Sequence, residues 1–166
     1  MNIVLIGMPG CGKSTVGVLL AKTMLMDFVD TDLLIQRQYG KSLCELIDEY
    51  GLDGFKQIED RVLTEFNEDH CVVATGGSAV YGESAMHNLK QHAVTVYLKL
   101  STVDINRRIH NITTRGIAMP NGCTMEQLYE ERAPLYERYA DITVDCTDLS
   151  AEECVTRIKE ATTGRL

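Results

Sequence analysis

Short apolar runs alternate along the chain with longer stretches in which apolar residues recur at helical spacing. Five runs predict buried strands: NIVLI at 2–6, DFV at 27–29, CVVAT at 71–75, AVTVYLKL at 93–100 and DITVD at 141–145. Strands that are separated by helices favour βαβ units and a parallel sheet that is covered on both faces. We therefore expect an α/β fold with three layers, α/β/α, around a five-stranded parallel sheet.

The segments between these runs are expected to be mostly helical. Helices are predicted at 13–26, 83–92, 102–111, 125–139 and 151–161. The segment 33–67 is also helical, but Gly40, Gly51 and Gly54 predict that it breaks into roughly three pieces. The stretch 112–124 contains glycine and proline and has weak periodicity. With 166 residues, the chain fits a single domain over 1–166.

The loop after the first strand carries the strongest chemical signal. It reads GMPGCGKST at 7–15 and matches G-x-x-x-x-G-K-[ST] between a strand and a helix. Glycines let backbone N–H groups curl around an anion, and the following helix presents the positive end of its dipole. Lys13 can reach β- and γ-phosphate oxygens, and Ser14 can ligate Mg²⁺. The loop predicts a nucleoside triphosphate site, with contacts from Gly10, Cys11, Gly12, Lys13, Ser14 and Thr15.

Two carboxylates follow the second strand. Asp30 and Asp32 are one residue apart, so in an extended segment both side chains point the same way. One can hold Mg²⁺ through water, and the other can orient and deprotonate an attacking hydroxyl. A surface turn or a helix N-cap would use the same residues. The phosphate loop one helix earlier favours the chemical interpretation.

The net charge and the cysteine pattern indicate which partners and which cellular compartment to expect. With 16 Lys and Arg against 24 Asp and Glu, the formal net charge is −8, a poor match to nucleic acid or an anionic membrane. No apolar run approaches the roughly 20 residues that cross a bilayer, and no basic segment precedes the first apolar run. The six cysteines form no C-x-x-C pair, and scattered thiols indicate a reducing compartment. We expect a cytoplasmic monomer without a nucleic-acid or membrane partner.

Six motifs extend the picture over nearly the whole chain. GMPGCGKST, DFVDTD, GFKQIE, ATGGSAV, TTRG and ERAPLYERYAD occur in the order and at about the spacings of the shikimate kinase family, which the chain resembles. The resemblance implies a P-loop kinase fold, with a substrate-binding helical segment at about 33–61 and a lid at about 112–124. It also implies transfer of the ATP γ-phosphoryl group to the 3-hydroxyl of shikimate, with Mg²⁺ as cofactor, in aromatic amino-acid synthesis.

The resemblance further implies roles for individual residues. Asp30 is similar to the acid that holds Mg²⁺ through water, and Asp32 to the acid that binds the acceptor hydroxyls and acts as base. Arg115 is similar to the lid arginine that reaches the phosphates, and Arg108 to an arginine that stacks on adenine. Lys13, Asp32 and Arg115 would be catalytic. Further acceptor contacts would come from Lys56, Gly76, Gly77 and Arg132.

Three positions depart from the family pattern. Lys56 stands where the family has an arginine that grips the acceptor carboxylate, and lysine keeps the charge but loses the planar two-pronged grip. Ser78 replaces the third glycine of G-G-G, and Gly116 replaces the proline that usually follows the lid arginine. All three lie in acceptor or lid contacts. Phosphoryl transfer is therefore indicated more strongly than shikimate as its acceptor.

Two alternatives stay open on the sequence alone. The first is a related kinase for another hydroxylated small acid, such as a sugar acid. The second is a nucleotide-dependent switch or a simple ATPase. A GTPase would carry an N-K-x-D motif after a late strand, which this sequence lacks. An ATPase would not need the combination of Asp32, Lys56 and Arg132.

Overall fold

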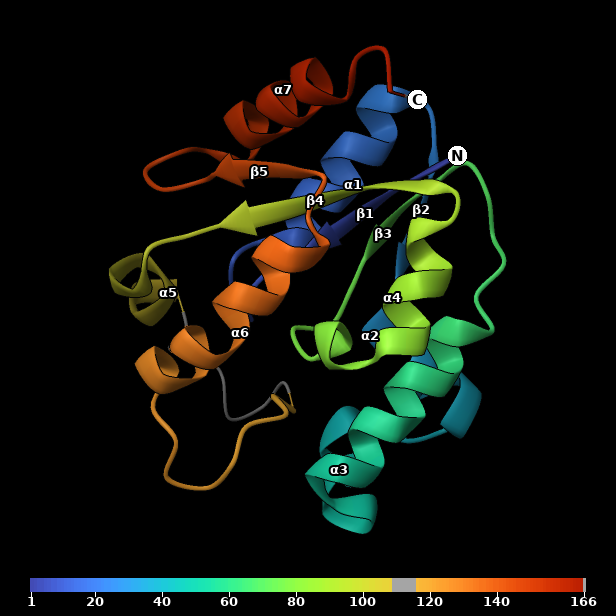
Figure 1. The fold of residues 1–166 in the computed structure, drawn as a ribbon, viewed down its shortest axis with the longest axis vertical. Coiled ribbons are helices and arrows are strands. Elements are labelled where there is room, and N and C mark those ends of the chain that lie inside the picture. Colours follow the sequence, from blue (N-terminus) through green and yellow to red (C-terminus); the bar gives the residue numbers. More distant parts are fainter. Residues whose placement is uncertain (109–115, 166) are drawn as a thin grey trace.

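The computed structural model, which describes residues 1–108 and 116–165, is built on a parallel sheet of five strands (Figure 1). The strand order is β2-β3-β1-β4-β5. The strands are β1 (Asn2–Ile6), β2 (Asp27–Asp30), β3 (Cys71–Ala74), β4 (Ala93–Lys99) and β5 (Ile142–Asp145). The predicted α/β fold with a five-stranded parallel sheet is confirmed.

Helices cover both faces of this sheet. Helices α1 (Lys13–Met24) and α7 (Ala151–Thr162) pack against each other on one face. Helices α4 (Glu83–Lys90) and α6 (Met125–Tyr139) contact β4 on the other face, and α5 (Thr102–Arg108) follows β4 (Figure 1). The last three residues of the helix expected at 102–111 lie outside the described part of the chain.

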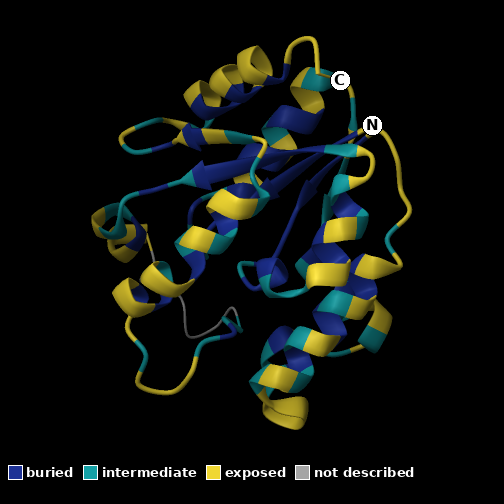
Figure 2. Cartoon of the chain, viewed as in Figure 1, coloured by how far each residue is buried: buried dark blue, intermediate teal, exposed yellow. Residues whose placement is uncertain are grey.

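The central strand explains why the first apolar run is continuous. β1 lies between β3 and β4, and Leu5 is opposite Ala74 on one side and Val96 on the other. Every residue of β1 is buried, and Figure 2 shows buried strands between helices whose outer faces are exposed. A strand that is covered on both faces can bury both sets of alternating side chains, so it reads as an unbroken apolar run.

The expected helical segment begins earlier than predicted. Helix α2 (Thr31–Tyr39) starts directly after β2, because the Asp30 side chain caps its first turn. Helix α3 (Leu43–Thr64) is interrupted at Gly51, whose φ of 70° and ψ of 176° are not helical. Gly40 ends α2, which gives three pieces as predicted, but Gly54 lies inside α3 without breaking it.

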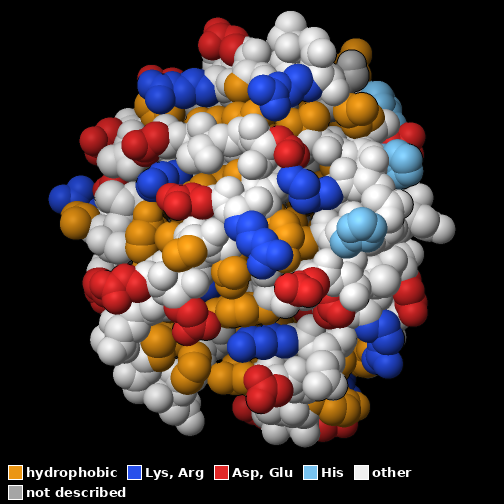
Figure 3. All heavy atoms as spheres, viewed as in Figure 1, with side chains coloured by type: hydrophobic (Ala, Val, Ile, Leu, Met, Phe, Trp, Pro, Cys, Tyr) orange, Lys and Arg blue, Asp and Glu red, His pale blue; other side chains and the backbone are white. Residues whose placement is uncertain are grey.

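The outer surface offers no strong field of one sign on the face that Figure 3 shows, where acidic and basic side chains are interspersed among the described residues. In the part of the chain that the structure describes, no helix is both long and apolar enough to cross a membrane.

Candidate active site

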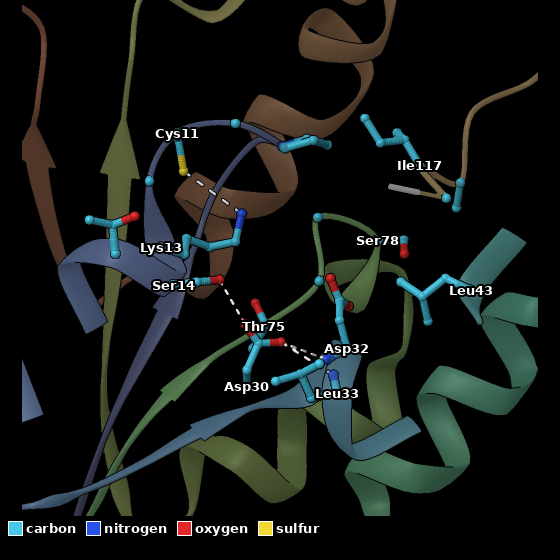
Figure 4. Close-up of a pocket in the computed structure, with 18 of the residues that line it drawn as sticks. Cys11, Lys13, Ser14, Asp30, Asp32, Leu33, Leu43, Thr75, Ser78 and Ile117 are labelled. Carbon is cyan, nitrogen blue, oxygen red and sulfur yellow. Dashed lines mark hydrogen bonds between the residues drawn. The ribbon is translucent and has the colours of Figure 1, made fainter. Parts of the chain in front are cut away.

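A cavity of about 810 Å³ lies beyond the carboxyl ends of the central strands. In parallel α/β sheets, ligands bind at this edge. The phosphate loop and the start of α1 line one part of the cavity, and the residues after β3 together with Arg132 of α6 line another. Figure 4 shows Lys13, Ser14 and Asp30 on one side, with Asp32 and Ser78 further along the cavity. Most of the nucleotide and acceptor residues that the sequence predicts therefore share one cavity; the exceptions are Lys56, which does not line it, and Arg115, which the structure does not describe.

The phosphate loop has the geometry of an anion site. Gly10 (φ 77°) and Gly12 (φ 98°) adopt left-handed backbone conformations that side chains disfavour. Gly12 is the N-cap of α1 and provides no side-chain cap, so the first N–H groups of the helix stay available to an anion. Lys13 is mostly buried, and its Nζ donates to the backbone oxygens of Gly7 at 2.7 Å and Met8 at 2.9 Å.

Asp30 caps α2 and also contacts the phosphate loop through Ser14. Its Oδ1 accepts from the backbone N–H of Asp32 at 3.0 Å and so caps α2. Its Oδ2 accepts from Ser14 Oγ at 2.7 Å, as a dashed line in Figure 4 marks. Because the two oxygens of the carboxylate point to different partners, the N-cap orients Asp30 toward Ser14.

The pair Ser14 and Asp30 fits Mg²⁺. Both are hard oxygen ligands, and they lie beside each other on the cavity wall. Among the described residues, no group of three His, Cys, Asp or Glu could hold a metal. Mg²⁺ is commonly bound by one or two protein oxygens, with phosphates and water completing its shell, so two ligands are sufficient in a kinase site.

Two acidic residues approach each other beside Gly76: Asp32, which is partly buried, and Glu59, which is fully buried. Burial raises the pKa of Asp32 to about 6, and the charge of Asp30 adds to this shift. Glu59 is 1% exposed, and burial raises its pKa to about 7. A Cβ on Gly76 would lie closer than 3.0 Å to Oε1 of Glu59 and to Oδ1 of Asp32. The glycine after β3 therefore allows two carboxyl groups to approach the same backbone position.

Glu59, the last residue of the motif GFKQIE, was not predicted to be a site residue. In the structure it shares the buried face of α3 with Phe55, Ile58 and Val62. Its Oε2 accepts a hydrogen bond from Ser78 Oγ, while its Oε1 has no hydrogen-bond partner among the described residues. Glu59 lies four residues after Phe55 and three before Val62, and this helical spacing was the signal that could have revealed its burial.

Arg132 and Lys56, the two predicted carboxylate-binding cations, are placed differently. Arg132 is 1% exposed, lines the cavity, and its Nη1 would lie 3.0 Å from a Cβ on Gly77. Lys56 is not among the cavity-lining residues, and its Nζ lies 4.2 Å from the centroid of the Tyr81 ring. The structure thus brings Arg132 to Gly77, whereas the Lys56 ammonium rests on an aromatic ring.

The remaining predicted residues that the structure describes lie near the phosphate loop. Arg108 lines the cavity beside Gly12, with Nη1 3.8 Å from where a Cβ would stand. Cys11 is buried, and its Sγ lies 3.8 Å from Nζ of Lys13 (Figure 4). Thr15 also lines the cavity. Arg115 lies outside the described residues.

The structure gives a local reason for Gly116. Its φ is +64°, a value that proline cannot adopt. A Cβ on Gly116 would lie 2.7 Å from Cβ of Leu43 and 2.8 Å from the backbone nitrogen of Cys44. The chain after the undescribed segment therefore passes tightly against the start of α3. Two residues later, Ala118 joins the cluster of apolar side chains between α2 and α3.

Comparisons with known proteins agree with this geometry. The family model described as shikimate kinase matches residues 9–163. The chain is 35% identical to a shikimate kinase of Vibrio cholerae over 161 residues, covering 95% of this chain and 92% of the relative. It is 37% identical to a shikimate kinase of Thermobifida fusca over 152 residues, covering 90% and 88%.

Solved structures show the same similarity. The shikimate kinase of Acinetobacter baumannii in complex with shikimate superposes with a TM-score of 0.84 at 28% identity, covering 99% of this chain and 93% of that one. The shikimate kinase of Aquifex aeolicus gives a TM-score of 0.80 at 29% identity, covering 99% and 98%. The family assignment made from the six motifs is therefore confirmed: the chain belongs to the shikimate kinase family.

Proposed function

We propose that the chain is an ATP-dependent kinase that transfers the γ-phosphoryl group of ATP to the 3-hydroxyl of shikimate. The observation that carries this proposal is the single cavity, lined by the phosphate loop in one part and by Asp32, Gly76, Gly77 and Arg132 in another. A kinase needs a donor site and an acceptor site within reach of each other, because positioning supplies much of its rate enhancement.

The nucleotide would occupy the phosphate loop. Its phosphates would meet the backbone of residues 10–15 and the Lys13 ammonium, which now donates to two carbonyls of the same loop. Ser14 and Asp30 would hold Mg²⁺, which neutralises charge on the β- and γ-phosphates when bound. Arg108 would contact the base, and Arg115 would reach the phosphates.

The acceptor would occupy the part of the cavity between α3 and α6. Asp32 would take the proton of the attacking hydroxyl, and its raised pKa of about 6 makes it a stronger base than an ordinary carboxylate while it stays ionised at neutral pH. Gly76 and Gly77 would offer backbone contacts, and the Arg132 guanidinium would pair with the acceptor carboxylate. Lys56 would add positive charge from its position on Tyr81.

We also propose that the enzyme acts in the cytoplasm as a monomer. The scattered cysteines support a reducing compartment, and the net charge of −8 argues against a nucleic-acid partner.

A kinase for a different hydroxylated acid is the second candidate, favoured by one observation: Lys56 does not line the cavity. An ADP-release assay separates the candidates when it is run with shikimate, with gluconate as a representative sugar acid, and without an acceptor. We expect ADP release that depends on shikimate. Release that requires gluconate instead supports the second candidate, and equal release without an acceptor indicates an ATPase.

A further inference from the structure

Tyr81 connects the two cations that are predicted to hold the acceptor carboxylate. It ends the short 3₁₀ helix η1 (Ala79–Tyr81), which follows Gly76 and Gly77 after β3. The Lys56 ammonium lies 4.2 Å from its ring centroid, and Cζ of Arg132 lies 5.2 Å from it. One aromatic ring therefore contacts a cation from α3 and a cation from α6.

The Tyr81 hydroxyl adds a direct hydrogen bond to one of these cations. It accepts from Nε of Arg132 at 3.2 Å and donates to a carboxylate oxygen of Glu131. Burial is the main reason that the pKa of Tyr81 is raised, so the phenol keeps the proton that it donates to Glu131. The hydroxyl can thus accept from Arg132 and donate to Glu131 at the same time.

This hydrogen bond determines which edge of Arg132 is left for a ligand. A guanidinium has five N–H donors in a fixed plane, and the Nε–H is engaged by Tyr81. Nη2 donates to the Ala118 carbonyl, and Nη1 makes no hydrogen bond with another residue that the structure describes. Nη1 lies next to Gly77, which lines the cavity. The edge formed by Nη1 and the second Nη2 hydrogen is therefore the one available to a carboxylate.

We propose that Tyr81 is a positioning residue for acceptor recognition, which fixes Arg132 with its Nη edge toward the cavity and holds the Lys56 ammonium on its ring. The inference rests on the proposed function, because it assigns Tyr81 to the acceptor site of that reaction. Tyr81 would not touch the acceptor. It would act through Arg132, whose charge is useful only in the orientation that the hydroxyl sets.

The test compares Tyr81→Phe, which keeps the ring and removes the hydroxyl, with Tyr81→Leu, which removes both. The matched control is Tyr39→Phe, because the Tyr39 hydroxyl also accepts from an arginine, Arg61, whose Cζ lies 5.9 Å from the ring centroid, and neither residue lines the cavity. We expect Tyr81→Phe to raise the KM for shikimate about tenfold, as for one lost hydrogen bond to a charged group, with kcat and the KM for ATP within about twofold of the parent. Tyr81→Leu should raise it further.

A second readout isolates the contact with Arg132. In an Arg132→Lys background the Nε–H is absent, so Tyr81→Phe should change the shikimate KM by less than about twofold. A parent that turns over shikimate, with an unchanged shikimate KM in Tyr81→Phe, would overturn the inference and leave the proposed function standing. If kcat and Tm fall and both KM values rise to a similar extent, Tyr81 has only a structural role, and this result would also overturn the inference. A parent without shikimate-dependent ADP release would overturn the proposed function itself.

Discussion

The Ser78 hydroxyl donates a hydrogen bond to Oε2 of Glu59, and both residues are buried. Ser78 is one of the positions at which the sequence departs from the family pattern, and the structure gives it a specific partner. A carboxyl group that is buried without compensation is costly, and one hydrogen bond offsets part of that cost. Glu59 keeps its other oxygen unpartnered among the described residues, beside Asp32 and Gly76.

Glu59 should make the enzyme less stable as the pH rises through its raised pKa. Its pKa is about 7 in the folded protein against 4.5 when unperturbed, so between these values the folded state retains a proton that the unfolded state has lost. The contribution of Glu59 to the free energy of unfolding is therefore greatest below pH 4.5 and decreases as the pH rises from 4.5 to about 7. The pKa of Asp32 is raised from 3.8 to about 6, so its contribution to stability also decreases as the pH rises between these values.

The measurement is Tm at pH 5, 6, 7 and 8 for the parent and for Glu59→Gln. Because glutamine does not titrate, the variant should show a flatter profile and a smaller loss between pH 5 and 8. Glu160→Gln, on the exposed side of α7, should follow the parent profile. A Glu59→Gln profile as steep as that of the parent would contradict the assignment of the titration to Glu59.

Asp32 should control the acid limb of the pH–rate profile. A base with a pKa of about 6 loses activity on protonation, so kcat/KM should fall about tenfold per pH unit well below pH 6. Asp32→Asn should lose most of the turnover at every pH, since the amide cannot accept the proton. Asp27→Asn, at the exposed start of β2, the strand that precedes Asp32, should retain the parent profile. Steady-state kinetics from pH 4.5 to 8 decide this prediction.

Lys13→Ala should reduce kcat by about 10²–10³, because in the proposed reaction it removes the cation that stabilises the transferring phosphoryl group. Lys22→Ala removes an exposed lysine from the last turn of the same helix and should leave kcat unchanged. Both variants are compared in the ADP-release assay at saturating substrates. Turnover of Lys13→Ala within twofold of the parent would refute the role of Lys13.

Gly116→Ala should destabilise the protein more than Gly122→Ala. Both glycines have positive φ, +64° and +79°, so both substitutions carry backbone strain of about 1–2 kcal/mol. Only the Cβ at position 116 meets neighbouring atoms, whereas the space around Gly122 is open within 4 Å. Overpacking adds about 1–3 kcal/mol to the Gly116 variant. Denaturant unfolding of the two variants measures the difference in the free energy of unfolding. Equal decreases in the two variants would show that Leu43 moves aside without destabilising the protein.

Local patterns predicted the parts of the site that depend on neighbouring residues in the chain. The phosphate loop lies between a strand and a helix, and the carboxylates of Asp30 and Asp32 follow a strand, so the topology of a parallel sheet brings them together. The sequence also indicated Gly76, Gly77 and Arg132, through the resemblance. The roles of individual site residues stay predictions, as do the acceptor segment at 33–61 and the lid at 112–124.

The features that the sequence did not reveal depend on contacts between distant elements. The burial of Glu59 could be inferred from its spacing on α3, but its hydrogen-bond partner could not, because Ser78 lies 19 residues away in the chain. Tyr81 has no motif, because its importance comes from one side chain of α3 and another of α6. From the sequence, Gly116 is only a departure from the proline of the family pattern. Its contact with the start of α3 becomes visible in the structure. The spacing of residues within one segment does not indicate which side chains of distant elements come into contact.

The hydrogen bond from Arg132 Nη2 to the Ala118 carbonyl joins the guanidinium that is proposed to bind the acceptor to the segment at 116–119. A carboxylate that draws on the same donor group changes the free energy of the arrangement in which Ala118 is bonded. Linkage is reciprocal, so a change in the arrangement of residues 116–119 alters the affinity for the acceptor by the same factor as the acceptor alters that arrangement. If Arg132 binds the acceptor as proposed, selectivity among acceptors depends both on the groups that touch the ligand and on the segment around Ala118, which fixes the same guanidinium through another of its hydrogens.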